Sequence, residues 1–540
     1  MTILAKLILL IFCTVPIYSI QTPSDPIVQL PNGKIRGLNH GSYFSFESIP
    51  YAEPPIGENR FEPPKPFTGN WSDIRDATKS PPKCMQWDQY LFKEDLLDGQ
   101  EDCLTINIYT PSIGGNKKYP VVVLIHGGAF MFGTADQSGH DYLMKRQDTV
   151  VVKMNYRLGP LGFLSTGDDV ISGNFGLKDQ LLALEWTKAN VAAFNGDPES
   201  ITAFGFSAGA ASVHLQMMNK NFEKIAKRAV SLSGTSFCDW VIMKNPARRA
   251  IALAKHLDCP TETSSSIKLC LKKKKAADIV RAVSKLQNIG YNPAIVFGPV
   301  IESKTVSNAF LSEHPENIIK SGKSAQIPWL ASYSKDDGGY NAAELMQQDS
   351  NGKEMIEILN DRWNELAPVN LFFENSVDEN QLDAYSNSLR EKYLGNKRFS
   401  AENYKLVQNM YTDLLFANGV RNAWKLHKQY TNSPVYAYVF DSPAPLGIGQ
   451  MISRRFDISF GTVHGDDFFL MFKSPVPVPF SKTQVVQSET FLNMVGEFNA
   501  NGTLQFADCK FRENNANTNG FYVMEIKPNS CETSNFENML

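Results

Sequence analysis

A serine between two glycines is the residue whose surroundings most clearly predict chemistry. Ser207 lies in a Gly-Phe-Ser-Ala-Gly segment (205–209), after the strand-like run 201–204 and before the helical segment 210–218. A serine on a tight strand-to-helix turn has strained backbone geometry, and glycines on both sides leave room for that turn. The context predicts a nucleophilic serine, whereas the five-residue pattern alone also occurs in ordinary surface turns.

A second glycine-rich turn could stabilise negative charge beside this serine. Gly127 and Gly128 directly follow the apolar run 121–125, so their backbone N–H groups can turn into a cavity. With the N–H of Ala208, they would form an oxyanion hole for the oxygen of an attacked carbonyl group. A Gly-Gly pair alone is an ordinary turn, and it gains this meaning only together with Ser207.

A nucleophilic serine needs a base, and the order of residues along the chain selects it. Glycine-flanked serines of this kind occur in the chain order nucleophile, acid, histidine. Of the eight histidines, His464 is the last, and turn-forming residues surround it. His427 lies in a basic helical stretch and is expected at the surface, and His126 belongs to the glycine turn.

The acid is expected where another strand ends. The segment 335–339 reads Lys-Asp-Asp-Gly-Gly and follows the strand-like run 329–333, and ligands gather at the carboxyl ends of such strands. Asp337 is the preferred acid and Asp336 the second choice. Such a carboxylate would hold the tautomer of the histidine and stabilise its cationic form.

These side chains require a sheet that brings distant segments together. Short runs of continuously apolar, β-branched residues alternate with helical stretches such as 177–194, which favours an α/β class with a mostly parallel sheet covered by helices on both faces. Residues 240–430 are richer in polar helical sequence, including 353–366 and 399–430, and are expected to form helical insertions and a cap. The predicted strands are 121–125, 149–154, 201–206, 229–232, 329–333 and 435–440.

Composition excludes some classes of function. The 540 residues carry a formal net charge of -3, and the one lysine run, 272–275, is short, so nucleic acid is not an expected partner. Lys6 and the apolar run 7–13 predict a signal peptide over residues 1–19, which leaves one domain at 20–540. Since no later stretch approaches 18 apolar residues, we expect a secreted, extracellular protein without a stable membrane anchor.

Cysteines and glycosylation motifs fit the secretory route. Removal of the signal peptide takes Cys13 and leaves seven cysteines, so at least one thiol stays unpaired. Short separations make three local disulfides plausible and leave Cys238 as the unpaired one. Sequons at Asn70 and Asn501 are expected glycosylation sites. The three expected bridges are Cys84–Cys103, Cys259–Cys270 and Cys509–Cys531.

The chain resembles the type-B carboxylesterase and cholinesterase family, from about residue 26 to 535. Beyond the serine segment, the resemblance rests on 101–104 (Glu-Asp-Cys-Leu) with Asn107, on 155–157 (Asn-Tyr-Arg) and on 176–180 (Gly-Leu-Lys-Asp-Gln). It implies the α/β-hydrolase fold, with a large, mostly parallel central sheet flanked by helices. It also implies residue roles: the triad Ser207, Asp337 and His464, the oxyanion donors Gly127, Gly128 and Ala208, Ser233 as a partner of the acid, and the disulfides Cys84–Cys103 and Cys259–Cys270.

Two departures from the usual residues of the family favour its non-cholinesterase branch. Asp337 stands where most members have Glu, so its carboxylate is one methylene shorter. Phe206 stands where Glu or another polar residue is common, which removes a charge that could favour cationic substrates.

The expected activity is the hydrolysis of carboxylic esters through an acyl-enzyme, with a small-molecule ester as partner and no cofactor or metal. Two alternatives stay open. One is a non-catalytic adhesion or binding protein of the same family, and the other is an esterase specialised for a lipid, hormone or pheromone. The natural substrate and the oligomeric state are open.

Overall fold

The computed structural model describes residues 25–88, 95–348, 352–475 and 479–536. The predicted signal peptide, residues 1–19, lies outside the described residues.

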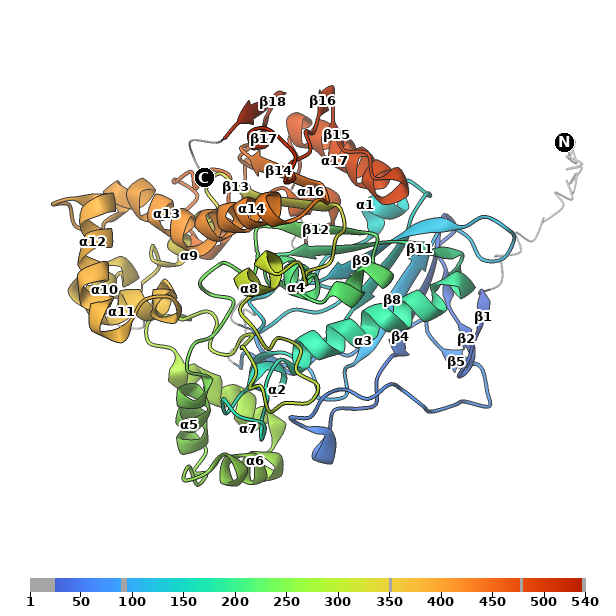
Figure 1. Cartoon of the computed structure of the whole chain (residues 1–540), viewed down its shortest axis with the longest axis horizontal. Coiled ribbons are helices and arrows are strands. Elements are labelled where there is room, and N and C mark those ends of the chain that lie inside the picture. Colours follow the sequence, from blue (N-terminus) through green and yellow to red (C-terminus); the bar gives the residue numbers. More distant parts are fainter. Residues whose placement is uncertain (1–24, 89–94, 349–351, 476–478, 537–540) are drawn as a thin grey trace, which may run out of the picture.

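One large sheet organises the described part of the chain (Figure 1). Its middle is parallel, from β10 through β9, β11, β12, β13 and β14 to β17, and antiparallel strands extend it at both ends. All six strands predicted from the sequence are present as β9 to β14, whereas the outer strands were not predicted. Its eleven strands, in spatial order, are β18 (Ser530–Asn535), β17 (Tyr522–Lys527), β14 (Val435–Phe440), β13 (Trp329–Ser334), β12 (Arg228–Leu232), β11 (Gly196–Phe206), β9 (Tyr119–Ile125), β10 (Val150–Met154), β8 (Thr105–Thr110), β4 (Phe44–Pro50) and β3 (Leu38–Asn39).

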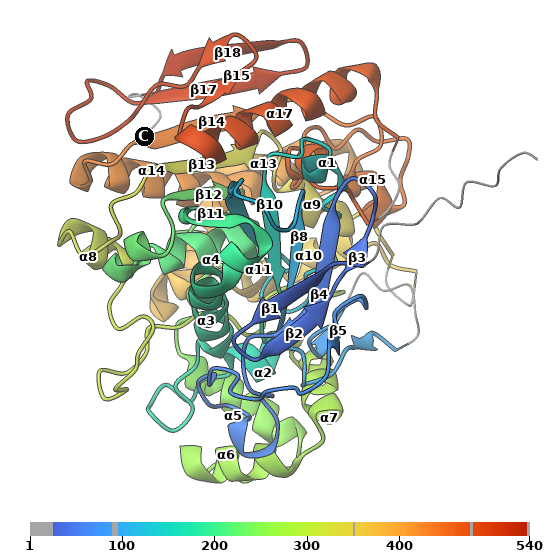
Figure 2. The same cartoon turned by 90° about the vertical axis from the view of Figure 1, so that its right-hand side faces the viewer.

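Helices cover both faces of this sheet (Figures 1 and 2). Along β9, Val121 and Val123 pack into the larger hydrophobic core with α3 (Phe175–Asn190) and α4 (Ala208–Gln216). The intervening Val122 and Leu124 pack into a second core on the other face, with α17 (Lys482–Asn501). Because both faces are buried, the central strands are continuously apolar.

The stretch 240–430 is largely helical, as predicted. The predicted helix 353–366 is split into α10 and α11. The predicted helix 399–430 begins later than expected, because residues 401–403 form a separate 3-10 turn; residues 404–430 make one long helix in which 413–417 form a π-turn. The helices are α5 (Pro246–His256), α6 (Ser264–Lys273), α7 (Ala276–Arg281), α8 (Pro315–Lys320), α9 (Gly339–Glu344), α10 (Met355–Asp361), α11 (Trp363–Asn370), α12 (Leu382–Leu394), α13 (Tyr404–Thr412) and α14 (Asn418–Tyr430).

The expectation that His427 lies at the surface was wrong. It is 2% exposed, and its Nε2 lies 3.0 Å from Nε2 of His214 in α4. Although α14 is basic, its inner face packs against the sheet, and His427 is on that face because Val420, Ala423 and Trp424 are buried with it.

Three disulfides close local loops, and all three were expected. They join Cys84 to Cys103, Cys259 to Cys270 and Cys509 to Cys531. Cys238 is the unpaired cysteine among the described residues, and burial raises the pKa of its thiol to about 12, so it stays protonated and unreactive.

Removing the first disulfide is expected to lower stability without abolishing the fold. Cys84 and Cys103 are 19 residues apart, and a loop of this length contributes about 3 kcal/mol by restricting the unfolded chain. The double variant Cys84→Ser/Cys103→Ser should therefore unfold at lower urea concentration than the parent protein under non-reducing conditions. An unchanged midpoint would show that this bridge adds nothing to stability.

Asn70 and Asn501, the two expected glycosylation sites, are exposed. None of the described helices is long and apolar enough to span a membrane.

Candidate active site

Ser207 lies on a sharp turn between β11 and α4. Its φ of 59° and ψ of -125° lie outside the usual regions, which is the strained geometry expected of this serine. The flanking glycines permit the turn: a Cβ on Gly205 would lie 2.1 Å from the carbonyl oxygen of Gly209. A Cβ on Gly209 would lie 2.0 Å from the carbonyl oxygen of Ile125, at the end of the neighbouring strand.

A histidine and a carboxylate meet beside this turn. Nδ1 of His464 lies 2.5 Å from Oδ1 of Asp337, and the side chains are buried, at 4% and 0% exposure. The second oxygen of Asp337 accepts hydrogen bonds from the Ser233 hydroxyl at 2.7 Å and the Ser334 N–H at 2.9 Å. The carboxylate is therefore held from two sides, with one oxygen left for the imidazole. Ser233 occupies the position that the resemblance implied.

The neighbouring carboxylate has a different place. Asp336 accepts a hydrogen bond from the N–H of Thr462 at 3.1 Å and another from Lys405. It therefore holds the loop that carries His464 and does not contact the imidazole. Of the two carboxylates considered from the sequence, Asp337 is the one that the fold brings to the histidine.

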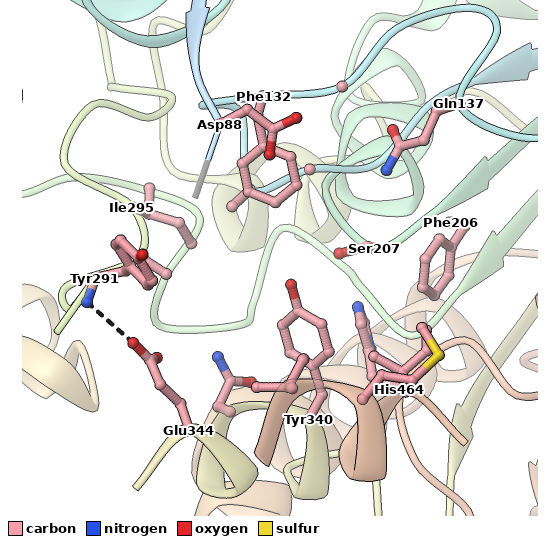
Figure 3. A pocket seen from close by; sticks show the side chains of 18 of the residues that line it. Asp88, Phe132, Gln137, Phe206, Ser207, Tyr291, Ile295, Tyr340, Glu344 and His464 are labelled. Atoms are coloured by element: carbon pink, nitrogen blue, oxygen red, sulfur yellow. Dashed lines mark hydrogen bonds between the residues drawn. The ribbon is translucent and has the colours of Figure 1, made fainter. Parts of the chain in front are cut away.

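Ser207 and His464 line the same cavity, and Figure 3 shows a ring nitrogen of His464 directed towards the Ser207 hydroxyl. In the described part of the chain no hydrogen bond joins these two side chains. Catalytic hydrogen bonds are often long without substrate and tighten when it binds. Ser207, His464 and Asp337 therefore converge at one cavity, with a direct hydrogen bond between His464 and Asp337 but none between Ser207 and His464.

Three backbone amides lie next to Ser207. A Cβ on Gly127 would lie 3.0 Å from Cβ of Ser207, so the glycine turn directly faces Ser207, and Gly128 has a φ of 108°. Ala208 is the first residue of α4, where an N–H has no partner within the helix. Among the described residues, none of these three amides donates a hydrogen bond to the protein. They remain available for the oxygen of a substrate.

Filling the space at Gly127 is expected to slow turnover. In Gly127→Ala, the new methyl group would lie 2.9 Å from the carbonyl oxygen of Phe206 and would shift the turn that carries the amides. Because losing one oxyanion donor typically costs about 10²- to 10³-fold in kcat, we expect a decrease of about 10²-fold. Steady-state kinetics with p-nitrophenyl acetate measure the change, and a melting curve verifies folding. A folded variant with the parent kcat would contradict the role of this turn.

The remaining buried histidines are poor candidates for the base. Burial lowers the pKa of His126 to about 4 and that of His427 to about 3, so both rings accept a proton poorly near neutral pH, and neither lines the cavity that contains Ser207. His126 stacks on Tyr156 at 4.3 Å between ring centroids, and its Nδ1 contacts the carbonyl oxygen of Gly127 at 2.8 Å. It supports the glycine turn, as expected from its position in the sequence.

The cavity around Ser207 has a volume of about 970 Å³ and a largely aromatic and aliphatic lining. Phe206, the residue before Ser207, packs on the His464 ring at 4.6 Å between centroids, so an aromatic ring and not a carboxylate lies beside the histidine. Sequence reasoning did not identify most of the lining, because it comes from segments far apart in the chain. The side chains that it missed include Trp240, Tyr291, Tyr340, Glu344, Phe416 and Met451.

Comparison with known proteins places this geometry in a family. Residues 24–539 match the Carboxylesterase family. Esterase-5B of Drosophila persimilis is 48% identical over 540 residues, covering 99% of each chain. Esterase P of Drosophila melanogaster is 46% identical over 527 residues, covering 96% of this chain and 97% of the relative.

A solved structure has the same fold. The crystal structure of juvenile hormone esterase from Manduca sexta, with OTFP covalently attached, superposes with a TM-score of 0.81. The sequence identity is 24%, and the match covers 95% of this chain and 97% of that one. The predicted α/β-hydrolase fold is confirmed, and the relatives named above are esterases of the non-cholinesterase branch. The chain belongs to the carboxylesterase family and is a carboxylic ester hydrolase.

Proposed function

We propose that Ser207 is the nucleophile of a serine esterase that works through an acyl-enzyme. The Ser207 oxygen forms a bond to the ester carbonyl carbon while its proton moves to Nε2 of His464. The carbonyl oxygen becomes negative and accepts hydrogen bonds from the amides of Gly127, Gly128 and Ala208. Collapse of this intermediate breaks the bond to the leaving alcohol, which takes the proton from His464.

Water completes the cycle by the reverse route. His464 takes a proton from water as the water oxygen attacks the acyl carbon, and then returns it to Ser207 as the acid leaves. Asp337 holds the N–H on Nδ1 of the imidazole, which keeps Nε2 free to accept a proton. Ser233 and Ser334 orient that carboxylate.

The observation that carries the proposal is the 2.5 Å contact between Asp337 and His464 at the cavity that also contains Ser207. Asp337 and His464 are 127 positions apart in the sequence. An ion pair with a purely structural role would not require a serine on a strained turn at the same cavity. The intact constellation favours an esterase over a non-catalytic adhesion protein.

The substrate is proposed to be a neutral ester. Phe206 and the other aromatic side chains of the cavity favour apolar groups, and the volume of about 970 Å³ is sufficient for a ligand of drug-like size. A specialised lipid, hormone or pheromone ester fits this lining as well as a generalist's range of esters does.

We also propose that a single catalytic domain spans residues 20–540 and that the protein is secreted, with glycans on Asn70 and Asn501. The three disulfides support an oxidising compartment, and both asparagines are exposed as glycosylation requires.

Partitioning with methanol tests the acyl-enzyme. Phenyl, nitrophenyl and ethyl butyrate share one acyl group, so all three should pass through one intermediate. In aqueous methanol each should give the same ratio of methyl butyrate to butyric acid. A ratio that depends on the leaving group would mean that water attacks the ester directly, and the acyl-enzyme would be rejected.

A further inference from the structure

The wall of the cavity opposite Ser207 contains a carboxylate that the proposed mechanism does not use. Glu344, in α9, is 8% exposed and faces the cavity across from the nucleophile (Figure 3). Burial raises the pKa of its carboxyl group. Among the described residues, no lysine or arginine forms an ion pair with Glu344. A buried carboxylate without a cation is costly unless hydrogen bonds compensate it.

Both oxygens of Glu344 bind one loop. Oε1 accepts a hydrogen bond from the N–H of Tyr291 at 3.0 Å, drawn as the dashed line in Figure 3, and Oε2 accepts one from Nδ2 of Asn292 at 2.7 Å. A Cβ on Gly290 would lie 2.7 Å from Oε1, so the loop backbone packs directly on the carboxylate. The carboxylate is therefore satisfied by this loop.

The loop is compact in itself. The N–H of Asn288 donates to the carbonyl oxygen of Asn292 at 2.7 Å, and the N–H of Asn292 donates back to the carbonyl oxygen of Ile289 at 2.8 Å. These hydrogen bonds join the two ends of the segment to each other. The two hydrogen bonds to Glu344 therefore fix the whole of residues 288–292.

This loop and α9 together build one wall of the cavity. Tyr291 and Ile295 line it from the loop side. Tyr340 and Glu344 line it from α9, and their spacing of four residues places them on one face of that helix. Since α9 begins two residues after Asp337, it connects the proposed acid to the opposite wall.

We propose that Glu344 is a positioning residue for substrate selectivity: by holding loop 288–292 against α9 it limits how long an ester arm the cavity accepts. The inference rests on the proposed function, because it concerns esters that react at Ser207. Without the carboxylate, the Tyr291 N–H and the Asn292 amide would lose their acceptor and the loop could move outwards. The kcat/KM for long esters would then rise relative to that for short esters.

Two variants break the contact from its two sides. Glu344→Ala removes both acceptors, whereas Asn292→Ala removes one donor and leaves the carboxylate bound to Tyr291. Glu357→Ala, which removes an exposed carboxylate from the nearby helix α10, is the matched control. Each protein is assayed with p-nitrophenyl esters from acetyl to decanoyl and with acetates of alcohols from ethanol to decanol.

In at least one series, Glu344→Ala should raise the ratio of kcat/KM for the longest ester to that for the shortest by about tenfold, mainly through KM. Asn292→Ala should shift it in the same direction by less, and Glu357→Ala should leave it within twofold. If both variants are folded and leave both series unchanged, or favour the short esters, the inference is overturned.

Labelling with diethyl p-nitrophenyl phosphate separates this outcome from failure of the proposed function. A protein that takes one diethyl phosphate group on Ser207 but keeps its length profile contradicts only the role of Glu344. A parent protein that hydrolyses esters but takes no label on Ser207 contradicts the proposed function itself.

Discussion

Ser207→Ala should lose on the order of 10⁶-fold in kcat for p-nitrophenyl acetate, because no oxygen remains to form the acyl-enzyme. Alanine fits the turn, since its Cβ occupies the position of the serine Cβ and no other contact of that side chain is needed. The oxyanion amides and the cavity stay in place, so a small residual rate above that in water is expected. Stopped assays at high protein concentration measure it.

The control for this variant is binding. Ser207→Ala should keep the melting temperature of the parent protein and should still bind a slowly hydrolysed ester, because the cavity lining is unchanged. Ordinary esterase turnover in a preparation verified by mass spectrometry would exclude Ser207 as the nucleophile.

Asp337→Asn should lower kcat by about 10⁴-fold, through the tautomer of His464. The Ser233 hydroxyl and the Ser334 N–H both donate to Oδ2, so an asparagine would place its carbonyl oxygen on their side. Its NH₂ group would then face Nδ1 of His464 and force that nitrogen to act as an acceptor. The proton would move to Nε2, which could no longer accept the proton of Ser207. Steady-state kinetics across neutral pH measure the loss.

Asp336→Asn is the matched comparison, since it makes the same change one residue earlier. It weakens the contacts to Thr462 and Lys405 that hold the histidine loop, so a decrease of at most about tenfold is expected. A loss in Asp336→Asn as large as that in Asp337→Asn would contradict the assignment of the acid.

The parallel half of the sheet and the convergence of Ser207, Asp337 and His464 could be predicted because local pattern and chain order carry the information. Strands β9 to β14 are buried on both faces, so they are continuously apolar. By contrast, β8 was missed because polar residues interrupt it: Asn107 is buried, and its side chain accepts a hydrogen bond from the N–H of Ser48 where β4 is irregular. The requirement for a polar side chain at position 107 arises from the irregular strand beside it, so it leaves no periodic pattern in the sequence.

The cavity wall shows the same limit. In the sequence, Glu344 is one of many carboxylates in a polar helical stretch. Only the folded position of loop 288–292 shows which groups bind it. His427 was wrongly predicted at the surface because charge composition does not reveal which face of a helix packs inwards. Phe416 lines the cavity from a π-turn, which shifts the register of its helix and cannot be read from a 3.6-residue period.

The convergence of Ser207, His464 and Asp337 is the central claim, and a covalent label tests it most directly. Diethyl p-nitrophenyl phosphate reacts with a serine that a neighbouring histidine activates, and it leaves a stable phosphate ester. Mass spectrometry of the intact parent protein should show one added diethyl phosphate group per chain, and peptide mapping should place it on Ser207. Asp337→Asn should react far more slowly. If the active enzyme takes the label on another residue, or remains unlabelled while it hydrolyses esters, the triad proposed here is not the catalytic one.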